Sequence, residues 1–456
     1  MIRSNAAAWY IICLLLGGIF FMSASPGRVD AALPTLESRI ISYSLESFDR
    51  RIYSYDMEID AKGDVHIVYS KPYSDRKANI HYVRRIGGAW QPEILLTPDG
   101  YRPSGSTFLD IGSDNRIHVC YIKDEGTTPP SESLNYLVID DGTVVKSETY
   151  VDGGGFHTRM QLDNNGYPVF VRGAHPGGVA KLALLTTTDG LTWDKSFLNL
   201  TQVPKFRLAD FEYNNGTYHI TYGDSAYTKL VWNGSVMTQK INGTFHDFYY
   251  ITSRDGVNWT EHVIDNSHTL FEMEFWTALE LVDDRPLIAM YKFAEYGNVY
   301  NRGTSVKLSE WSGSSWIHKI ITNRIYADTS EGMGVGLAVN GPGDYFGAWD
   351  FSPSYPQILP PSSAGNTAMR RSGPLNDWSP IAQLDSFSLE GRARLRIFGG
   401  KLYFLALGDY TDPKLNFREY NIADLNFVSL PVGNVPPPGV SSDFPLNAVY
   451  HMLLNK

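Results

Sequence analysis

Two short segments of the chain carry side chains suited to acid–base chemistry. The first is Phe156–Arg159, and the second, which follows a predicted turn at 163–166, is Arg172–His175. A histidine can remove or supply a proton near neutral pH, and a guanidinium group can neutralise a carboxylate next to that proton. His157, Arg172 and His175 are therefore candidate catalytic residues.

Further arginines, carboxylates and aromatic residues recur at similar places along the chain. Arginine grips a carboxylate or sulfate with paired hydrogen bonds, and aromatic rings stack on the faces of sugars. This combination suggests an acidic glycan as the ligand. The residues predicted to bind it are Tyr55, Arg159, Arg207, Glu274, Trp276, Arg392 and Arg394. The alternative is that these side chains pair with one another around a water-filled channel.

A repeated pattern indicates which elements would position these residues. Asp60 opens a turn that leads into an alternating run ending at Tyr69, and the second half of this pattern returns in Asn115–Tyr121 and Gly216–Tyr222. Each copy is followed by two more strand-like runs, joined by a turn that often ends in tryptophan. Four short antiparallel strands, repeated about every 50 to 68 residues, are typical of a β-propeller. The repeats start near residues 56, 106, 157, 206, 274, 333 and 392.

We therefore predict an all-β fold in which residues 37–456 form a single β-propeller of seven four-stranded blades, with six or eight blades as alternatives. In a propeller, the loops that enter the innermost strands and leave the second strands meet on one face, where ligands favour the concave rim. Residues 40–44 are expected to supply the outer strand that closes the ring with the last repeat. In contrast, His66, His118 and His219 recur at one strand position, which predicts packing and internal hydrogen bonding.

Two eight-residue segments, 186–193 (TTTDGLTW) and 252–259 (TSRDGVNW), place aspartate, glycine and tryptophan at matching positions. Asp-Gly suits a tight hairpin, and a buried indole fixes such a turn against its own sheet. These turns resemble the Asp-box, or BNR, repeats of the sialidase-like propeller superfamily. The resemblance implies a propeller fold, with Asp189 and Asp255 in structural roles on the face away from the active site.

The region 156–175 also resembles propeller polysaccharide lyases of the ulvan-lyase type, which carry one histidine before the inner strand and another after the second strand. This resemblance implies that Arg172 neutralises a uronate while His157 or His175 moves the proton. A sialidase would need three arginines to bind the substrate carboxylate. The Phe-Arg-Ile-Pro signature of that superfamily is absent from this sequence. The open alternatives are an enzyme, either a glycoside hydrolase or a polysaccharide lyase, and a non-catalytic surface or periplasmic interaction module.

The amino-terminal segment 1–31 has the features of a signal peptide. Arg3 precedes an apolar run at 9–22, and small residues surround a possible cleavage point after Ala31. We expect a secreted or periplasmic protein, with an uncleaved membrane anchor as the alternative. Cleavage would remove Cys13 and leave Cys120 alone, so no intramolecular disulfide is predicted.

The charge of the chain bears on its partners. The formal net charge is −10 and no run of lysine and arginine occurs, which argues against nucleic acid and anionic membranes. We expect carbohydrate as the partner, no membrane contact after signal cleavage, and a monomer. The sequence shows no phosphate-binding glycine loop, no serine-nucleophile motif and no metal-ligand spacing. We therefore expect no cofactor and no metal.

Overall fold

The computed structural model describes most of the chain between Glu37 and Leu425. The description has gaps at residues 44–53, 75–76, 99, 102, 126–131, 152–157, 175–180, 190–191, 201–206, 224–227, 233–236, 242–247, 266–271, 296–301, 326–334, 352–365, 373–381, 387–392 and 408–413. Residues 1–36 and 426–456 also lie outside it, and with them the predicted signal peptide.

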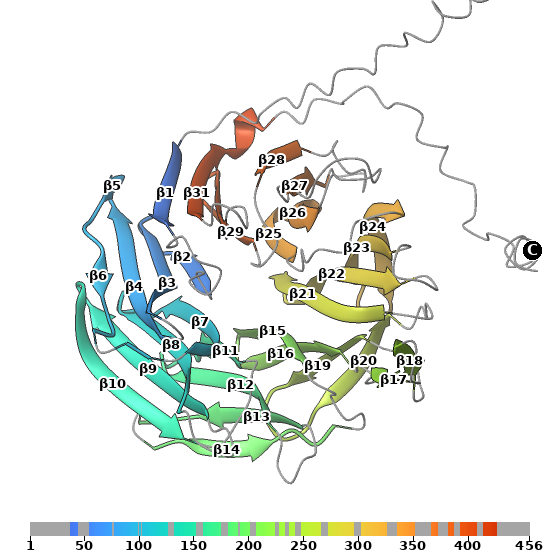
Figure 1. Ribbon diagram of the computed structural model, residues 1–456, viewed down its shortest axis with the longest axis horizontal. Coiled ribbons are helices and arrows are strands. Elements are labelled where there is room, and N and C mark those ends of the chain that lie inside the picture. The colour runs from blue at the N-terminus through green and yellow to red at the C-terminus, as the bar shows by residue number, and fades with distance from the viewer. Residues whose placement is uncertain are drawn as a thin grey trace, which may run out of the picture. The chain divides into compact units, whose positions relative to one another are not determined.

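Antiparallel β-strands make up almost all of the described regular structure and are arranged as a propeller (Figure 1). Six sheets have four strands and one has five. The five-stranded sheet is formed by β2 (Tyr55–Ile59), β3 (Val65–Ser74), β4 (Lys77–Ile86), β5 (Ala89–Trp90) and β6 (Ile94–Leu95). The next two sheets are formed by β7 (Pro103–Ile111), β8 (Ile117–Asp124), β9 (Glu132–Asp140) and β10 (Thr143–Val151), and by β11 (Thr158–Leu162), β12 (Pro168–Ala174), β13 (Lys181–Thr186) and β14 (Asp194–Phe197).

The remaining sheets continue in chain order. A sheet of β15 (Arg207–Asn214), β16 (Thr217–Gly223), β19 (Phe248–Ser253) and β20 (Thr260–Asp265) is interrupted by the separate hairpin β17 (Thr228–Trp232) and β18 (Met237–Ile241). The next two are formed by β21 (Glu272–Val282), β22 (Arg285–Glu295), β23 (Arg302–Trp311) and β24 (Trp316–Ile325), and by β25 (Val335–Gly341), β26 (Asp344–Phe351), β27 (Asn366–Arg371) and β28 (Ala382–Ser386). The last has β29 (Arg394–Phe398), β30 (Lys401–Leu407), β31 (Lys414–Asn421) and β1 (Glu37–Tyr43), followed by a 3₁₀ turn at Ile422–Asp424.

The innermost strands form a closed ring. In order around it, β2 contacts β7, β7 contacts β11, β11 contacts β15, β15 contacts β21, β21 contacts β25, β25 contacts β29, and β29 contacts β2. The predicted all-β propeller is confirmed, with six blades of four strands.

The prediction of seven four-stranded blades does not match the sheet that begins with β2. There β5 and β6 both pair with β4, so two short strands share the outer position. Gly87 and Gly88, with φ of 55° and 84°, turn the chain sharply after β4. Pro92 then falls between β5 and β6 and has no N–H group to continue the ladder. The outer strand is therefore divided.

The amino-terminal strand β1 closes the ring. It pairs antiparallel with β31, with Ile40 opposite Asn416. The expectation that residues 40–44 supply the outer strand of the last repeat is thus confirmed for β1, which ends at Tyr43. Side chains add to the pairing, since Nε1 of Trp90 donates to Oε1 of Glu37 at 2.5 Å.

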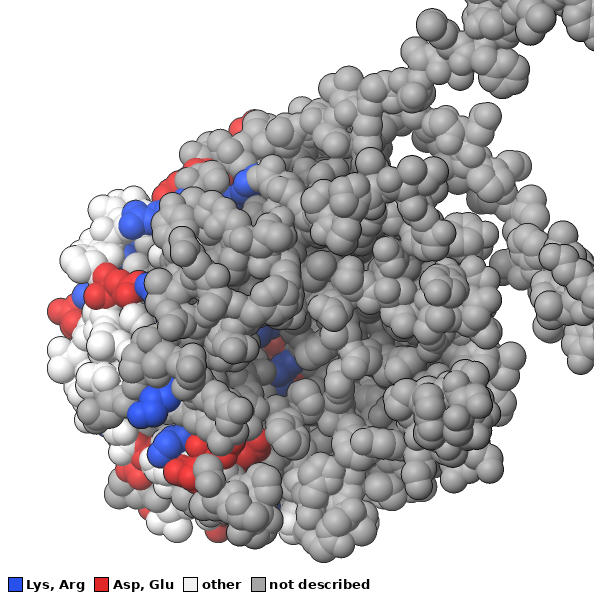
Figure 2. All heavy atoms as spheres, viewed as in Figure 1, with Lys and Arg blue, Asp and Glu red and all other residues white. Residues whose placement is uncertain are grey.

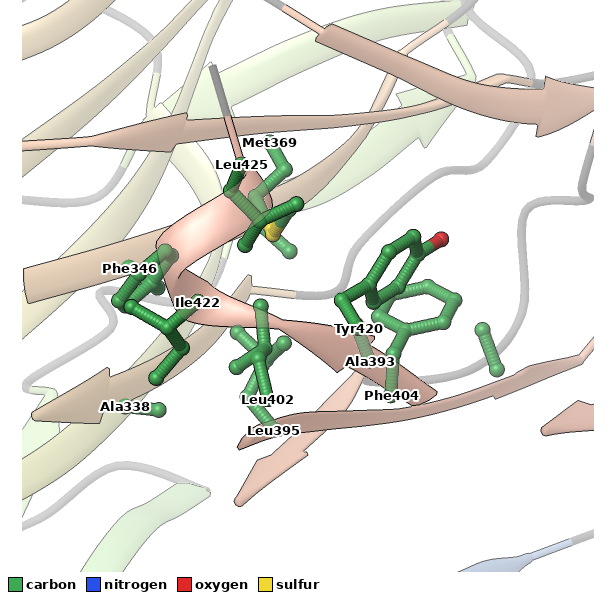
Figure 3. Packing of buried hydrophobic residues seen from close by; sticks show 12 residues of the cluster. Ala338, Phe346, Met369, Ala393, Leu395, Leu402, Phe404, Tyr420, Ile422 and Leu425 are labelled. Carbon is green, nitrogen blue, oxygen red and sulfur yellow. The ribbon is translucent and has the colours of Figure 1, made fainter. Parts of the chain in front are cut away.

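Apolar side chains fill the space between neighbouring sheets. Figure 3 shows the cluster formed by β25–β27 and β29–β31, in which the rings of Phe404 and Tyr420 lie together and Phe346 lies near Ile422. Equivalent clusters join the other neighbouring sheets. Burial of apolar surface between sheets is the main stabilising contribution of a fold without helices to cover its faces.

The three histidines predicted to be structural occupy one recurring environment. Burial lowers the pKa of His118 and of His219 to about 4, so both imidazoles are neutral at neutral pH. Each of the three rings is held by a tyrosine hydroxyl on the adjacent strand. The Nδ1–Oη distances are 2.7 Å for His66 and Tyr82, 2.5 Å for His118 and Tyr136, and 2.6 Å for His219 and Tyr250. Their prediction as packing residues is confirmed.

The two Asp-Gly turns link third and fourth strands. Oδ1 of Asp255 accepts the N–H groups two and three residues later, at 2.9 and 2.8 Å, and Oδ1 of Asp189 accepts the N–H group three residues later, at 2.7 Å. Gly256 has a φ of 70°, and a Cβ there would lie 2.9 Å from Leu184. Nε1 of Trp259 donates to the carbonyl of Gly256 at 3.2 Å. Both aspartates therefore stabilise turns, as predicted.

Two further observations concern cysteine and membranes. Cys120 is a buried free thiol on β8. Within the described residues, no helix has the length and apolar character needed to cross a bilayer.

Candidate functional site

Side chains of the innermost strands converge on a central cavity. All seven strands of the ring contribute to its lining, and its volume of about 50 Å³ has room for a few water molecules. Figure 2 shows a hollow near the middle of the visible face, with atoms of basic and acidic residues inside it. Charged side chains are therefore gathered where the blades meet.

Two arginine–aspartate pairs lie where the innermost strands begin. Nε of Arg159 lies 3.1 Å from Oδ1 of Asp210, and Nε of Arg394 lies 2.8 Å from Oδ1 of Asp56. Both guanidinium groups also face the ring of Phe108, with Cζ–centroid distances of 4.7 Å for Arg159 and 5.8 Å for Arg394. We call Asp56, Arg159, Asp210 and Arg394 the entry layer.

The aspartates of the entry layer also join neighbouring sheets. Oδ2 of Asp56 accepts the N–H group of Leu109 on β7 at 3.2 Å, and Oδ2 of Asp210 accepts that of Leu279 on β21 at 3.0 Å. Each carboxylate thus holds an arginine with one oxygen and the next sheet with the other. The Arg159–Asp210 contact is a hydrogen bond, and hydrogen bonds between charged groups are stronger than neutral ones, so it fixes the position of Arg159. Arg394 forms an ion pair with Asp56, and its buried Nε has no hydrogen-bond partner among the described residues.

Two residues further along the strands lies an acidic inner layer, composed of Glu58, Glu212, Glu280 and Arg396. Nε of Arg396 donates to Oε2 of Glu58 at 2.7 Å, and its Nη1 lies 3.9 Å from Oε1 of Glu280. Burial raises the pKa of Glu280 to about 7 and that of Glu212 well above its ordinary value, which the Glu280 carboxylate raises further. Burial therefore favours the protonated forms of Glu212 and Glu280, whereas Glu58 forms an ion pair with Arg396.

The described residues place two of the predicted site residues, Arg159 and Arg394, on the cavity wall. Tyr55 is 6% exposed and packs in an apolar cluster, and Arg172 on β12 is fully buried opposite Thr158. For Arg207, Glu274 and Trp276 the structure describes only the backbone, on β15 and β21. His157, His175 and Arg392 lie outside the described residues.

Sequence reasoning missed Glu58, Asp210, Glu212, Glu280 and Arg396 as cavity residues. Their signal was present, because charged residues two positions apart on a strand face the same side of the sheet. The pairs Asp56/Glu58, Asp210/Glu212 and Arg394/Arg396 all follow this spacing on innermost strands.

Known proteins provide a limited comparison. No protein-family model matches the chain, and neither does any curated protein. Among solved structures, the chain is similar to the phage phi92 endosialidase, with 11% identity, a TM-score of 0.44, and coverage of 88% of this chain and 71% of that one. It is also similar to the polysaccharide lyase Uly1, with 12% identity, a TM-score of 0.49, and coverage of 85% and 99%.

A third similar structure is the GH93 α-L-arabinofuranosidase of Fusarium graminearum, with 10% identity, a TM-score of 0.41, and coverage of 84% of this chain and 98% of that one. These proteins process carbohydrates according to their names. At identities and TM-scores this low, the similarity is one of fold only. It assigns neither a family nor a reaction to this protein.

Proposed function

We propose that the protein is an extracytoplasmic, monomeric propeller that binds an acidic carbohydrate at the mouth of its central channel. The observation that carries this proposal is the pair of guanidinium groups on Arg159 and Arg394, which face one phenyl ring and are each held by an aspartate. Carboxylate and sulfate groups accept paired hydrogen bonds from arginine. In the same proposal, the five-stranded sheet acts as the seventh blade, because β2 contacts β7 on one side and β29 on the other.

The distribution of charge favours the entry layer as the anion site. In the entry layer, the charges of two arginines and two aspartates balance. In the inner layer, three carboxyl groups surround the single guanidinium of Arg396. An anionic group placed deeper would meet carboxyl groups that already retain protons because of burial and mutual repulsion. We therefore propose that Arg394 and Arg159 contact the acidic group from the outer side of the channel.

Processing of the bound carbohydrate is the catalytic form of this proposal. Thr158, the first residue of β11, is paired with Arg172 near the end of β12. In sequence, His157 directly precedes β11 and His175 directly follows β12, at the same edge of the sheet. We propose these two histidines as acid and base, with Arg172 as the neutralising group of a lyase. Arg207, Glu274, Trp276 and Arg392 belong to the proposed binding rim. Arg207 begins β15, Arg392 precedes β29, and Glu274 and Trp276 lie in the first half of β21.

One observation favours the alternative of a non-catalytic interaction module. Arginines of the channel are paired with carboxylates: Arg159 with Asp210, Arg394 with Asp56, and Arg396 with Glu58. Groups that satisfy one another in this way need no substrate to balance their charge. Binding without turnover is then the expected behaviour.

The test uses the full mature chain and purified polysaccharides. Polygalacturonate, alginate, ulvan and chondroitin sulfate are compared with neutral starch and galactomannan by affinity electrophoresis, and new reducing ends are measured in parallel. We expect retardation by at least one anionic polysaccharide, weakened about tenfold or more in Arg394→Gln because a charged hydrogen bond is lost. Arg116→Gln, which changes an exposed arginine just before β8, is the matched control.

The outcomes separate the forms of the proposal. Release of reducing ends that disappears in His157→Ala supports processing, and unsaturated products identify a lyase. Binding without release supports the interaction module. If none of the anionic polysaccharides retards the folded protein, the proposed function is wrong.

A further inference from the structure

A second, larger cavity lies between the sheet of β15, β16, β19 and β20 and the sheet of β21–β24, which are neighbours in Figure 1. Its volume is about 720 Å³, within the range of small-molecule sites. The turn at 214–217, the turn at 254–258 and the turn at 283–285 contribute to its rim or border it. Innermost strands β15 and β21 end at the first and third of these turns, and the second links the third and fourth strands of its sheet. The cavity therefore lies at the sheet edge opposite the channel mouth.

A small residue lines the cavity at a position where the first sheet carries an arginine. In the first sheet, Arg84 is paired with His66 and reaches Asp141 of the next sheet, with Nη2 2.9 Å from Oδ1. Thr252 is paired with His219 in the same way, and its short side chain lines the cavity. A gap that an arginine closes between one pair of sheets is thus left open between another pair.

Aromatic rings form one wall of the cavity. Trp311 is the last residue of β23, the third strand of its sheet. The third strands of two other sheets, β13 and β19, end in the smaller residues Thr186 and Ser253. The Trp311 ring lies 4.9 Å from that of His262, and the Tyr250 ring lies 6.1 Å from His262. Buried Tyr250 is fixed in turn by His219. These contacts, together with Trp316 at 5.1 Å from the Trp311 ring, fix the position of Trp311, which is partly exposed.

Amide and carboxylate groups are fixed on the opposite rim. Oδ1 of Asp284 accepts from Nδ2 of Asn214 at 2.7 Å and from Nδ2 of Asn215 at 3.1 Å, which ties turns of the two sheets together. Asn215 and Asp284 both adopt positive φ, 50° and 60°, a conformation that asparagine and aspartate tolerate better than other non-glycine residues. Asn258 completes the rim, with its Nδ2 donating to Asp255 at 2.7 Å.

We propose that this cavity is a second carbohydrate-binding site, which takes a neutral hexopyranose unit of an oligosaccharide. The C–H face of the sugar packs on Trp311, and its hydroxyl groups bond to Asn258, Asn215 and Asp284. A neutral ligand fits because Arg254 and Asp284 on the rim offset each other's charge. Buried His219 adds no charge, since its pKa is lowered to about 4. The site is separate from the channel mouth and does not depend on the function proposed for it.

The experiment measures binding of cellohexaose, laminarihexaose, maltohexaose, mannohexaose and chitohexaose to the full mature chain by calorimetry. Bacterial production avoids glycans at the Asn-x-Thr triplets of Asn215 and Asn258, which border the cavity. Thr252→Arg introduces at this gap the side chain that closes the equivalent gap beside His66. Trp311→Ala removes the stacking surface, and Trp311→Phe retains part of it. Phe197→Ala, a change of an exposed aromatic residue on β14 outside the cavity, is the control.

We expect at least one neutral hexasaccharide to bind, with the affinity lowered about tenfold or more by Trp311→Ala and by Thr252→Arg, and less by Trp311→Phe. Phe197→Ala and Arg394→Gln should bind as the unchanged protein does. Three results overturn the proposal: no hexasaccharide binds, binding is unaffected by both Thr252→Arg and Trp311→Phe, or binding is lost in Arg394→Gln, which would place the sugar in the channel. If Trp311→Ala does not fold, Thr252→Arg and Trp311→Phe decide.

Discussion

Arg159 and Asp210 form an ion pair between two neighbouring innermost strands, with 3.1 Å between Nε and Oδ1, and the same carboxylate accepts the N–H group of Leu279 from the next sheet. One aspartate on β15 therefore connects β11 with β21. The arrangement combines two roles, because the contact that joins three sheets also sets the position of a guanidinium group at the channel mouth.

This relationship predicts a large stability cost for Asp210→Ala. The change leaves Arg159 almost fully buried without its carboxylate and also removes a hydrogen bond between sheets. Breaking a buried pair from one side costs about 3–5 kcal/mol in free energy of unfolding. Urea unfolding followed by tryptophan fluorescence measures it. Asp141→Ala, which removes the exposed partner of Arg84, is the control and should cost less than about 1 kcal/mol. Equal losses for the two variants would contradict the role given to Asp210.

The acidic inner layer predicts a pH dependence of stability. Burial raises the pKa of Glu280 to about 7, although Arg396 opposes the shift. The folded state therefore keeps a proton that the unfolded state loses above about pH 4.5, so this contribution to stability declines as the pH rises towards 7. Glu280→Gln, which mimics the protonated acid, should gain stability relative to the unchanged protein as the pH is raised from about 5 to about 8. Urea unfolding at several pH values measures the difference, and a constant difference would refute the raised pKa.

The histidine–tyrosine pairs predict a coupled loss and recovery. Tyr250→Phe removes the hydroxyl that bonds Nδ1 of buried His219, and an unsatisfied buried polar group costs about 1–3 kcal/mol. Replacing both residues with phenylalanine removes the unsatisfied nitrogen and should recover part of that loss. Thermal unfolding of the two single variants and the double variant measures the coupling. Additive losses would show that the pair does not interact.

Closure by β1 predicts that the amino-terminal strand is needed for a stable ring. A chain that begins at residue 45 lacks β1, so β31 becomes an unpaired edge, and exposed edges promote aggregation. We expect a lower melting temperature and concentration-dependent light scattering. The control is the mature chain, which begins at residue 32 and keeps β1. Identical behaviour of the two chains would mean that β1 does not close the ring.

The sequence predicted the strands where local chemistry determines them. Turn residues such as Gly63 and Gly216, with φ of 85° and 77°, precede alternating runs that form β3 and β16. Their repetition indicated the propeller. The division of the outer strand into β5 and β6 was not predicted. Residues 89–95 stand where a fourth strand is expected, and the interruption at Pro92 was not recognised.

The candidate sites were harder to predict because they depend on contacts between distant residues. Arg394 and Asp56 meet only when the last innermost strand closes on the first. The second cavity depends on Thr252 being small where Arg84 is large, and on Trp311 from the neighbouring sheet. A single sequence gives the residue types at these positions, but it does not give the pairing between sheets that decides what they contact.

The most direct test of the central claim is calorimetric binding of an anionic polysaccharide that the unchanged protein retains, repeated with Arg394→Gln, Arg394→Lys and the control Arg116→Gln. Arg394→Gln should weaken binding about tenfold or more, and Arg116→Gln should have no effect. Arg394→Lys should recover binding only in part, because an ammonium group cannot form paired hydrogen bonds. Equal affinity of all four folded proteins would contradict an anion site at the channel mouth.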